Sequence, residues 1–402
     1  MLRALSLAVV VFIGVMAAGC GKGEQAAPQA TGTGGTAEKP AEAPKAEKPP
    51  KGAIVVKVGV VVPKTGPIAT YGDMVEKAVL LAAEDAKSEG KVFPELIIVD
   101  NGADQQKTAS AVSKFVDVDK VDVIIGPVTT NNALAAGDKA EAGGVPLVTP
   151  TATNVRVTEG RKYVFRVCFT DDLQGKAAAN FAYDTLKARK AAILMDSGEA
   201  YSMGLGETIA AVFKQRGGEV VSQVAFVSGA DDFGGQVTQL RLKKPEVIFM
   251  PTYYEPAAKC VSQARAAGLR TVFVGTDGWD SQALYTLSAG AVKGNYFTTH
   301  FSPLEDRPLV RKFVQNFRAE YGKDPDALAA LGYDAALVVW DAVKRAGKAD
   351  RKAITDALAA TKDFEGVTGK FSIDEKHNAV KSVVVLETGE KGATIKEVVA
   401  PQ

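Results

Sequence analysis

Seven polar or aromatic residues of this chain follow the ends of short apolar runs, where side chains are well placed for binding chemistry. They are Tyr71, Thr130, Thr151, Thr153, Tyr201, Tyr253 and Asp277. Threonine hydroxyls and free amides at a helix start form a site for an anion such as a carboxylate. A buried aspartate in the same cleft suits a ligand ammonium group. Together these residues predict a receptor for a zwitterion, of which an amino acid is the simplest.

Each of these residues also has a purely structural interpretation. Thr130 and Thr153 are suited to capping helix N-termini. Asp277 is followed by glycine, a common turn pair in which the aspartate is solvated. Tyr201 and Tyr253 are suited to packing at a surface. The ligand-binding interpretation rests on the combination, because every member falls at the end of a predicted strand.

The elements that position these residues alternate between β-branched runs and amphipathic stretches. The runs are 55–62, 96–99, 121–125, 146–148, 164–167, 191–195, 220–227, 247–250 and 272–274. Between most of them the apolar residues recur at helical spacing, as in 75–86. This alternation predicts α/β architecture with parallel sheets covered on both faces. About 350 residues are too many for one open sheet, so two doubly wound lobes are expected. Ligands of such sheets bind beyond the carboxyl ends of the strands.

Composition excludes several classes of function. The 402 residues carry 48 basic and 47 acidic side chains, and a net charge of +1 provides no electrostatic basis for binding nucleic acid. Three cysteines and two histidines in no ligand spacing predict neither a metal site nor a disulfide scaffold. The pair Gly204 and Gly206 opens a helix, but Ile209 replaces the third small residue of a dinucleotide-binding motif. We therefore expect no cofactor and no enzymatic activity.

The N-terminus has the pattern of an export signal. Arg3 precedes an apolar run over 4–18 that is too short to span a bilayer, which predicts a signal peptide over 1–19. The sequence 17–20 (Ala-Ala-Gly-Cys) resembles the cleavage box of bacterial lipoproteins, and the resemblance implies lipidation of Cys20. The alternative is a plain secretory signal with an incidental cysteine. Residues 20–53 are expected to form a disordered tether, because 21–50 contain no Val, Ile, Leu, Met or aromatic residue.

Several segments together carry a resemblance to a known family. They are 58–63, 65–67, 71–72, 124–127, 146–153, 263–269 and 331–335. These segments resemble the Leu/Ile/Val-binding proteins, which are type I periplasmic substrate-binding proteins of ABC importers. The resemblance implies two lobes that are joined by three crossovers and close on the ligand like a hinged trap. Lobe 1 would comprise 54–170 plus 299–370, and lobe 2 would comprise 171–298 plus 371–402.

The resemblance also implies roles for the candidate residues. Thr130 and Thr153 match the residues that hold the ligand carboxylate and amine, and Thr151 matches a backbone contact to the amino group. Asp277 stands where the family has an acidic partner for the ammonium group. The remaining candidates match aromatic positions of the cleft, namely Tyr71, Tyr201 and Tyr253.

Three departures from the family pattern bear on ligand preference. Asp277 is one methylene shorter than the glutamate of Leu/Ile/Val binders. Thr129 and Ala103 replace a cysteine pair of some members, so that disulfide is expected to be absent. Leu328 sits near a position that is often aromatic. The amino-acid class is retained, whereas the side-chain preference is left open.

The combined prediction is an exported, monomeric binding protein, anchored on the periplasmic side of a membrane through Cys20. It would capture a branched-chain or other small apolar amino acid and deliver it to ABC permease subunits. Amides, urea-like ligands and aromatic carboxylates are the alternative ligands, and sensing without transport is the alternative role. Cys168 and Cys260 are expected to be buried free thiols. His300 and His377 are expected at the hinge or the surface.

Overall fold

The first lobe is built on a sheet of five parallel strands in this computed structural model, which describes residues 48–400. The strands in spatial order are β2 (Val92–Asp100), β1 (Ile54–Val62), β3 (Val123–Ile125), β4 (Leu147–Thr149) and β5 (Val164–Arg166). The expected signal peptide, Cys20 and most of the expected tether lie outside the described residues.

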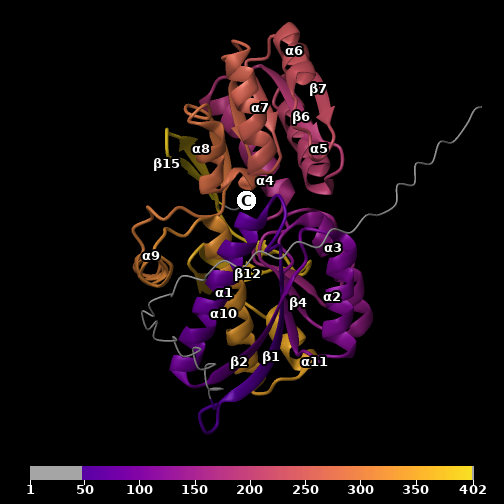
Figure 1. Cartoon of the computed structure of the whole chain (residues 1–402), viewed down its shortest axis with the longest axis vertical. Helices are drawn as coiled ribbons and strands as arrows, with labels where there is room; N and C mark the ends of the chain where they lie inside the picture. Colours follow the sequence, from indigo (N-terminus) through magenta and orange to yellow (C-terminus); the bar gives the residue numbers. More distant parts are fainter. Residues whose placement is uncertain (1–47, 401–402) are drawn as a thin grey trace, which may run out of the picture. The chain divides into compact units, whose positions relative to one another are not determined.

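Helices cover both faces of this sheet (Figure 1). The alternation of side chains along a strand sends Val58 and Val60 of β1 to one face and Val61 to the other. The first face packs against α1 (Ala69–Glu89) and α10 (Ala327–Ala346). The second packs against α2 (Gln105–Asp117) and α3 (Thr130–Gly143). The near-continuous valine run of β1 is therefore explained by burial on both sides. The further helices after the second lobe are α9 (Pro308–Tyr321) and α11 (Arg351–Ala359).

The second lobe contains a sheet of seven strands in the order β15-β14-β10-β9-β8-β6-β7. Its parallel part consists of β6 (Lys190–Asp196), β7 (Glu219–Phe226), β8 (Val247–Met250), β9 (Val272–Gly275) and β10 (Tyr296–Thr299). An antiparallel edge follows from β14 (Val383–Thr388) and β15 (Ala393–Val399). The helices are α4 (Asp171–Asn180), α5 (Ala200–Gln215), α6 (Gly234–Lys243), α7 (Tyr254–Ala266) and α8 (Gln282–Ser288).

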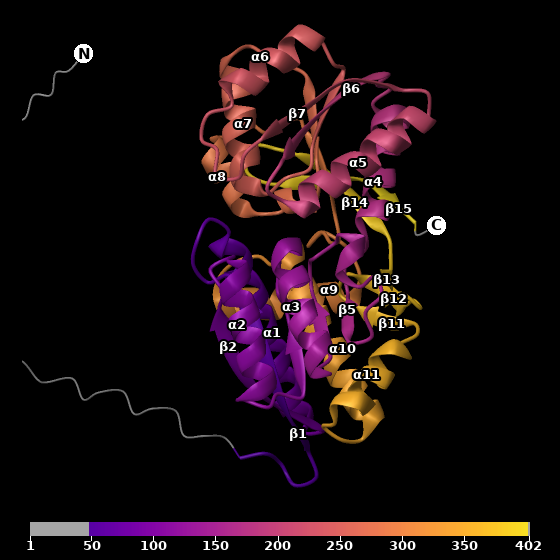
Figure 2. The same ribbon diagram turned by 90° about the vertical axis from the view of Figure 1, so that its right-hand side faces the viewer.

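The chain passes between the lobes three times, at 167–170, 300–307 and 381–382 (Figure 2). The two-lobed α/β fold with three connecting segments is thus the predicted one. A small third sheet consists of β11 (Phe364–Gly366), β12 (Gly369–Ile373) and β13 (Ala379–Val380). The expected limit between 370 and 371 falls inside β12, which pairs with β11. The sheet order therefore favours a third crossing after β13 instead.

The cysteine prediction is confirmed for the two thiols that the structure describes. Cys168 lies in the first crossing and Cys260 on α7, and both are free and buried. Burial raises the pKa of each thiol to about 12, so both are protonated at neutral pH. Within 48–400, no helix has both the length and the apolar character to span a membrane. Over the same residues, no group of His, Cys, Asp and Glu side chains gathers in a way that would hold a metal ion.

Candidate ligand site between the lobes

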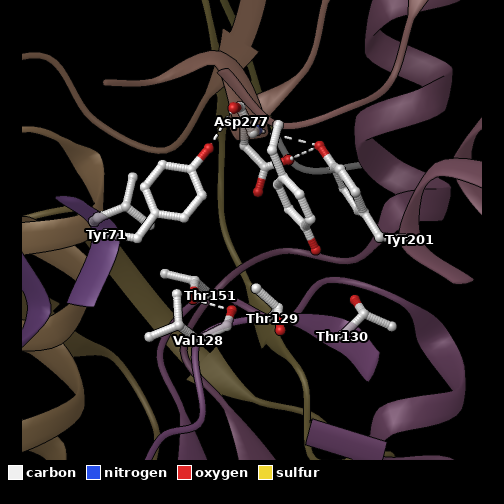
Figure 3. A pocket seen from close by; sticks show the side chains of 10 residues that line it. Tyr71, Val128, Thr129, Thr130, Thr151, Tyr201 and Asp277 are labelled. Atoms are coloured by element: carbon white, nitrogen blue, oxygen red, sulfur yellow. Dashed lines mark hydrogen bonds between the residues drawn. The ribbon is translucent and has the colours of Figure 1, made fainter. Parts of the chain in front are cut away.

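A small pocket lies where the carboxyl ends of strands from both lobes face one another (Figure 3). Its empty space, counted together with open solvent at its mouth, is about 300 Å³. Ten residues line it: Tyr71, Val128, Thr129, Thr130, Thr151, Tyr201, Tyr253, Asp277, Gly278 and Leu328. Six of the seven candidates from the sequence are therefore brought together, and Thr153 is not among them.

The start of α3 forms one wall of the pocket. Thr129 is the N-cap residue of this helix but makes no side-chain capping hydrogen bond. Thr130 is the first helical residue, so it is not itself the cap. An uncapped helix start presents free N–H groups, and these attract an anion through both hydrogen bonding and the helix dipole. The strand before it turns tightly at Gly126, where a Cβ would lie 2.3 Å from the Val61 carbonyl oxygen.

The loop after β4 supplies Thr151 to the pocket, whereas Thr153 is not among the lining residues. The Thr151 hydroxyl donates to the Val128 carbonyl oxygen at 2.5 Å, so its remaining capacity is to accept. Thr153 is buried, and its carbonyl oxygen accepts from the backbone N–H of Asp171 at 3.0 Å. The buried Arg166 guanidinium shapes this loop by donating to the carbonyl oxygens of Ala152 and Asn154. Thr153 is not among the residues that line the pocket, and its part in ligand binding stays a prediction.

Asp277 lies on the opposite wall, in the turn that follows β9. Its side chain is 12% exposed. The Tyr201 hydroxyl donates to Oδ1 at 2.6 Å and is itself 2.6 Å from the Thr276 hydroxyl. His300 Nε2 lies 3.3 Å from Oδ2. Burial lowers the pKa of His300, so the ring is neutral at pH 7, and since a carboxylate only accepts, Nε2 carries the proton.

Three tyrosines close the sides of the pocket. Tyr201 and Tyr253 stack with ring centroids 5.4 Å apart, and Tyr71 meets Tyr253 edge to face at 6.0 Å. The Tyr71 hydroxyl donates to the Gly278 carbonyl oxygen and so joins the two lobes. Burial raises the pKa of all three phenols well above their ordinary value. They are therefore neutral hydrogen-bonding groups with large apolar faces.

A second carboxylate, Asp171 at the start of α4, is buried behind this wall. Neither of its side-chain oxygens has a hydrogen-bond partner at the distances and angles of a normal bond among residues 48–400. Burial is the main cause that raises its pKa, to about 8, and Asp277 adds to the shift, whereas Thr153 and Arg166 oppose it. Asp171 is therefore largely protonated at neutral pH.

Sequence reasoning missed two kinds of site residue. Val128 and Gly278 are direct neighbours of predicted candidates, so the strand-end rule that selected the candidates would also have included them. His300 lies at the second crossing, which agrees with its expected place at the hinge, but its burial against Asp277 is not predicted by the sequence. Its place follows from the pairing of β9 with β10, which no local pattern reveals.

The pocket opens outward into a larger groove of about 1,260 Å³, which includes open solvent. Thr129 and Tyr253 border both spaces. Five carboxylates line the groove against one lysine: Asp104, Asp196, Glu199, Asp231, Glu255 and Lys259. A ligand entering by this route would pass between Thr129 and Tyr253.

Comparison with known proteins is consistent with this architecture. A family model described as periplasmic binding protein matches residues 55–393. The leucine-, isoleucine-, valine-, threonine- and alanine-binding protein of Pseudomonas aeruginosa is 28% identical over 351 residues, covering 86% of this chain and 93% of that protein. The crystal structure of a leucine-binding protein from Thermotoga maritima is 38% identical with a TM-score of 0.83, covering 86% of this chain and 99% of that one. A branched-chain amino acid transporter substrate-binding protein from Streptococcus pneumoniae, solved with isoleucine, is 33% identical with a TM-score of 0.82, covering 86% and 100%.

Proposed function

Because the chain belongs to the periplasmic binding protein family, we propose that it captures an amino acid between its lobes and delivers it to an ABC permease. The observation that carries this proposal is the opposition of two walls. An uncapped helix start at Thr130 faces a pocket whose other wall holds the Asp277 carboxylate. Such a pair matches the carboxylate and the ammonium group of one α-amino acid.

The remaining lining favours a small apolar side chain. Val128 and Leu328 offer apolar surface, and the neutral tyrosine rings add more. The Pseudomonas aeruginosa relative is named for leucine, isoleucine, valine, threonine and alanine, and the Streptococcus pneumoniae protein was solved with isoleucine, which supports a small amino acid with branched-chain members first. We therefore assign leucine, isoleucine or valine as the first ligands to test.

A ligand panel tests this assignment directly. The purified protein is heated with each proteinogenic amino acid, with small amides and urea, and with benzoate. At a hundredfold excess over Kd, binding adds about 2.7 kcal/mol to the free energy of unfolding and raises Tm measurably. Stabilisation by leucine, isoleucine or valine supports the proposal. Stabilisation by benzoate or an amide alone would overturn it in favour of a ligand without an ammonium group.

The export and anchoring part of the proposal rests on residues 1–20. In the host cell, the wild type is expected in the membrane fraction and a Cys20→Ala variant in the soluble exported fraction, because the variant has no thiol to lipidate. Metabolic labelling with a fatty acid provides the direct readout. Cys168→Ala is the matched control, since that thiol is buried and should not change the distribution. Equal membrane association of Cys20→Ala and wild type would contradict lipid anchoring.

A further inference from the structure

Asn131 reaches across the cleft beside the pocket and bonds to the other lobe. Its Nδ2 donates to the Gly198 carbonyl oxygen at 3.0 Å, and its Oδ1 accepts from the backbone N–H of Ala200 at 3.1 Å. One primary amide thus satisfies a backbone acceptor and a backbone donor only two residues apart. The opposite orientation of the amide would oppose donor to donor and acceptor to acceptor, so the network fixes its orientation.

The bond to Ala200 has the role of a helix cap supplied by the other lobe. Helix α5 begins at Ala200, and its own N-cap residue, Glu199, makes no side-chain capping hydrogen bond. A free N–H at a helix start is stabilised by a side-chain oxygen. The oxygen here comes from Asn131 on α3 of the first lobe. Separation of the lobes would break this bond and leave the helix start to solvent.

A second asparagine holds the same residue from the first lobe. Asn154 Nδ2 donates to the Ala200 carbonyl oxygen at 3.0 Å. The Asn154 side-chain oxygen accepts from the Arg156 N–H, and its carbonyl accepts from buried Arg166, so this residue is fixed within its own lobe. The approach requires Gly204 on α5, where a Cβ would lie 2.7 Å from Asn154 Nδ2. Both backbone groups of Ala200 are therefore held by the first lobe.

We infer that Asn131 and Asn154 form an interlobe latch on Ala200 that sets the balance between open and closed forms. The latch residues are positioning residues, since neither lines the inner pocket. Their sequence neighbours connect them to it: Thr130 precedes Asn131, and Tyr201 follows Ala200. Since the latch bonds exist only when the lobes meet, they add to the stability of the closed form whatever the ligand. Their loss should speed ligand release far more than it slows capture.

The test combines ligand kinetics with a ligand-free measurement of lobe distance. L-leucine is the probe for kinetics, and this arm rests on the proposed function. Asn131→Ala and Asn154→Ala should each raise Kd and the dissociation rate about tenfold, because each variant loses one or two neutral hydrogen bonds. The association rate should stay within about threefold of the wild type. Gly204→Ala should act in the same direction, because its methyl group displaces Asn154.

The lobe distance is followed by fluorescence energy transfer between dyes on cysteines at the exposed positions Lys139 of α3 and Lys214 of α5. Without ligand, the latch variants should populate longer distances than the wild type. The matched controls are Asn316→Ala on α9, which lines neither cavity, and Gly235→Ala on α6, whose Cβ would meet open space. Both controls should match the wild type in kinetics and distance.

The two arms separate failure of the latch from failure of the proposed function. The latch is overturned if both asparagine variants keep the wild-type lobe distance without ligand. Where leucine binds, both variants must also keep the wild-type dissociation rate. If the wild type binds no amino acid, the proposed ligand is overturned, and the distance arm alone decides the latch. Melting curves of each variant exclude unfolding as the source of a changed distance. A variant that unfolds is replaced by Gly204→Ala, which leaves both asparagines in place.

Discussion

The two walls of the pocket differ in how far their polar groups are already engaged. On the first-lobe wall, the hydroxyls of Thr129 and Thr130 have no hydrogen-bond partner among residues 48–400, and the helix start behind them is uncapped. On the second-lobe wall, Asp277 is bonded to Tyr201 and lies against His300. Tyr201 is itself bonded to Thr276. The helix start on the first-lobe wall is open to a ligand, whereas Asp277 on the second-lobe wall belongs to a preassembled network.

This difference suggests a division of work between the lobes. Free N–H groups and hydroxyls accept a ligand carboxylate without breaking protein bonds, so the first lobe suits initial capture. A network that is already ordered loses little entropy when the lobes close, so the second lobe suits tight completion of the site. Changes to the first wall should therefore act locally, while changes to the second should disturb several groups together.

The largest expected effect comes from removing the charge at the centre of the network. Asp277→Asn keeps the size of the side chain but removes the partner of a ligand ammonium group. Affinity for L-leucine should fall about 100-fold or more, the size found when a buried charge loses its partner. Isothermal titration calorimetry measures it.

The matched control for this change is Asp231→Asn in the outer groove, where the carboxylate is 83% exposed. It alters the net charge equally, so any general electrostatic effect appears in both variants. We expect the affinity of Asp231→Asn to stay within about threefold of the wild type, because exposed charges are screened. If Asp277→Asn also stays within threefold, Asp277 does not bind the ammonium group.

Local sequence patterns predict part of the fold and part of the candidate site. Strands with near-continuous β-branched runs are specified locally, and β1 (Ile54–Val62) matches the expected run 55–62. The rule that ligands bind beyond strand ends then selected residues that do line the pocket, such as Thr130 and Tyr201. Local patterns and one topological rule were sufficient for these residues.

Features that depend on long-range contacts could not be predicted in this way. Thr153 follows a strand end but is not among the residues that line the pocket. His300 reaches Asp277 only through sheet pairing. Asn131 has no local signal, because its partners lie about 70 residues away on the other lobe. For Asn131 and His300, the contact lies outside the segment that a local sequence pattern describes.

A smaller loss of ligand affinity is expected from a change at the first-lobe wall. Thr130→Val removes the hydroxyl but keeps the shape and the backbone N–H groups of α3. Affinity for L-leucine should fall about tenfold, since one hydrogen bond to a charged group is lost while the others remain. Thr238→Val on the exposed face of α6 is the control and should leave Kd unchanged. An equal loss in both variants would show that the Thr130 hydroxyl has no special role.

The last effect concerns stability and comes from the carboxyl behind the network. The pKa of Asp171 is raised to about 8 by burial and by Asp277, whereas an unfolded aspartate has a pKa of about 3.9. Between these values the folded protein binds more protons than the unfolded chain, so Asp171 makes the free energy of unfolding fall as pH rises from 4 to 8. Asp171→Asn removes this dependence. Its Tm relative to the wild type should therefore be higher at pH 8 than at pH 5.

The neighbouring Asp172 provides the control for this prediction, because it is exposed on the same helical turn. Asp172→Asn should change Tm by the same small amount at both pH values. The groups that face Asp171 are Thr153, Asp277, Arg166 and Asp172. Asp171→Asn leaves all four in place, and Asp172→Asn changes only Asp172 itself. A Tm difference for Asp171→Asn that does not change with pH would mean that Asp171 is ionised in the folded protein.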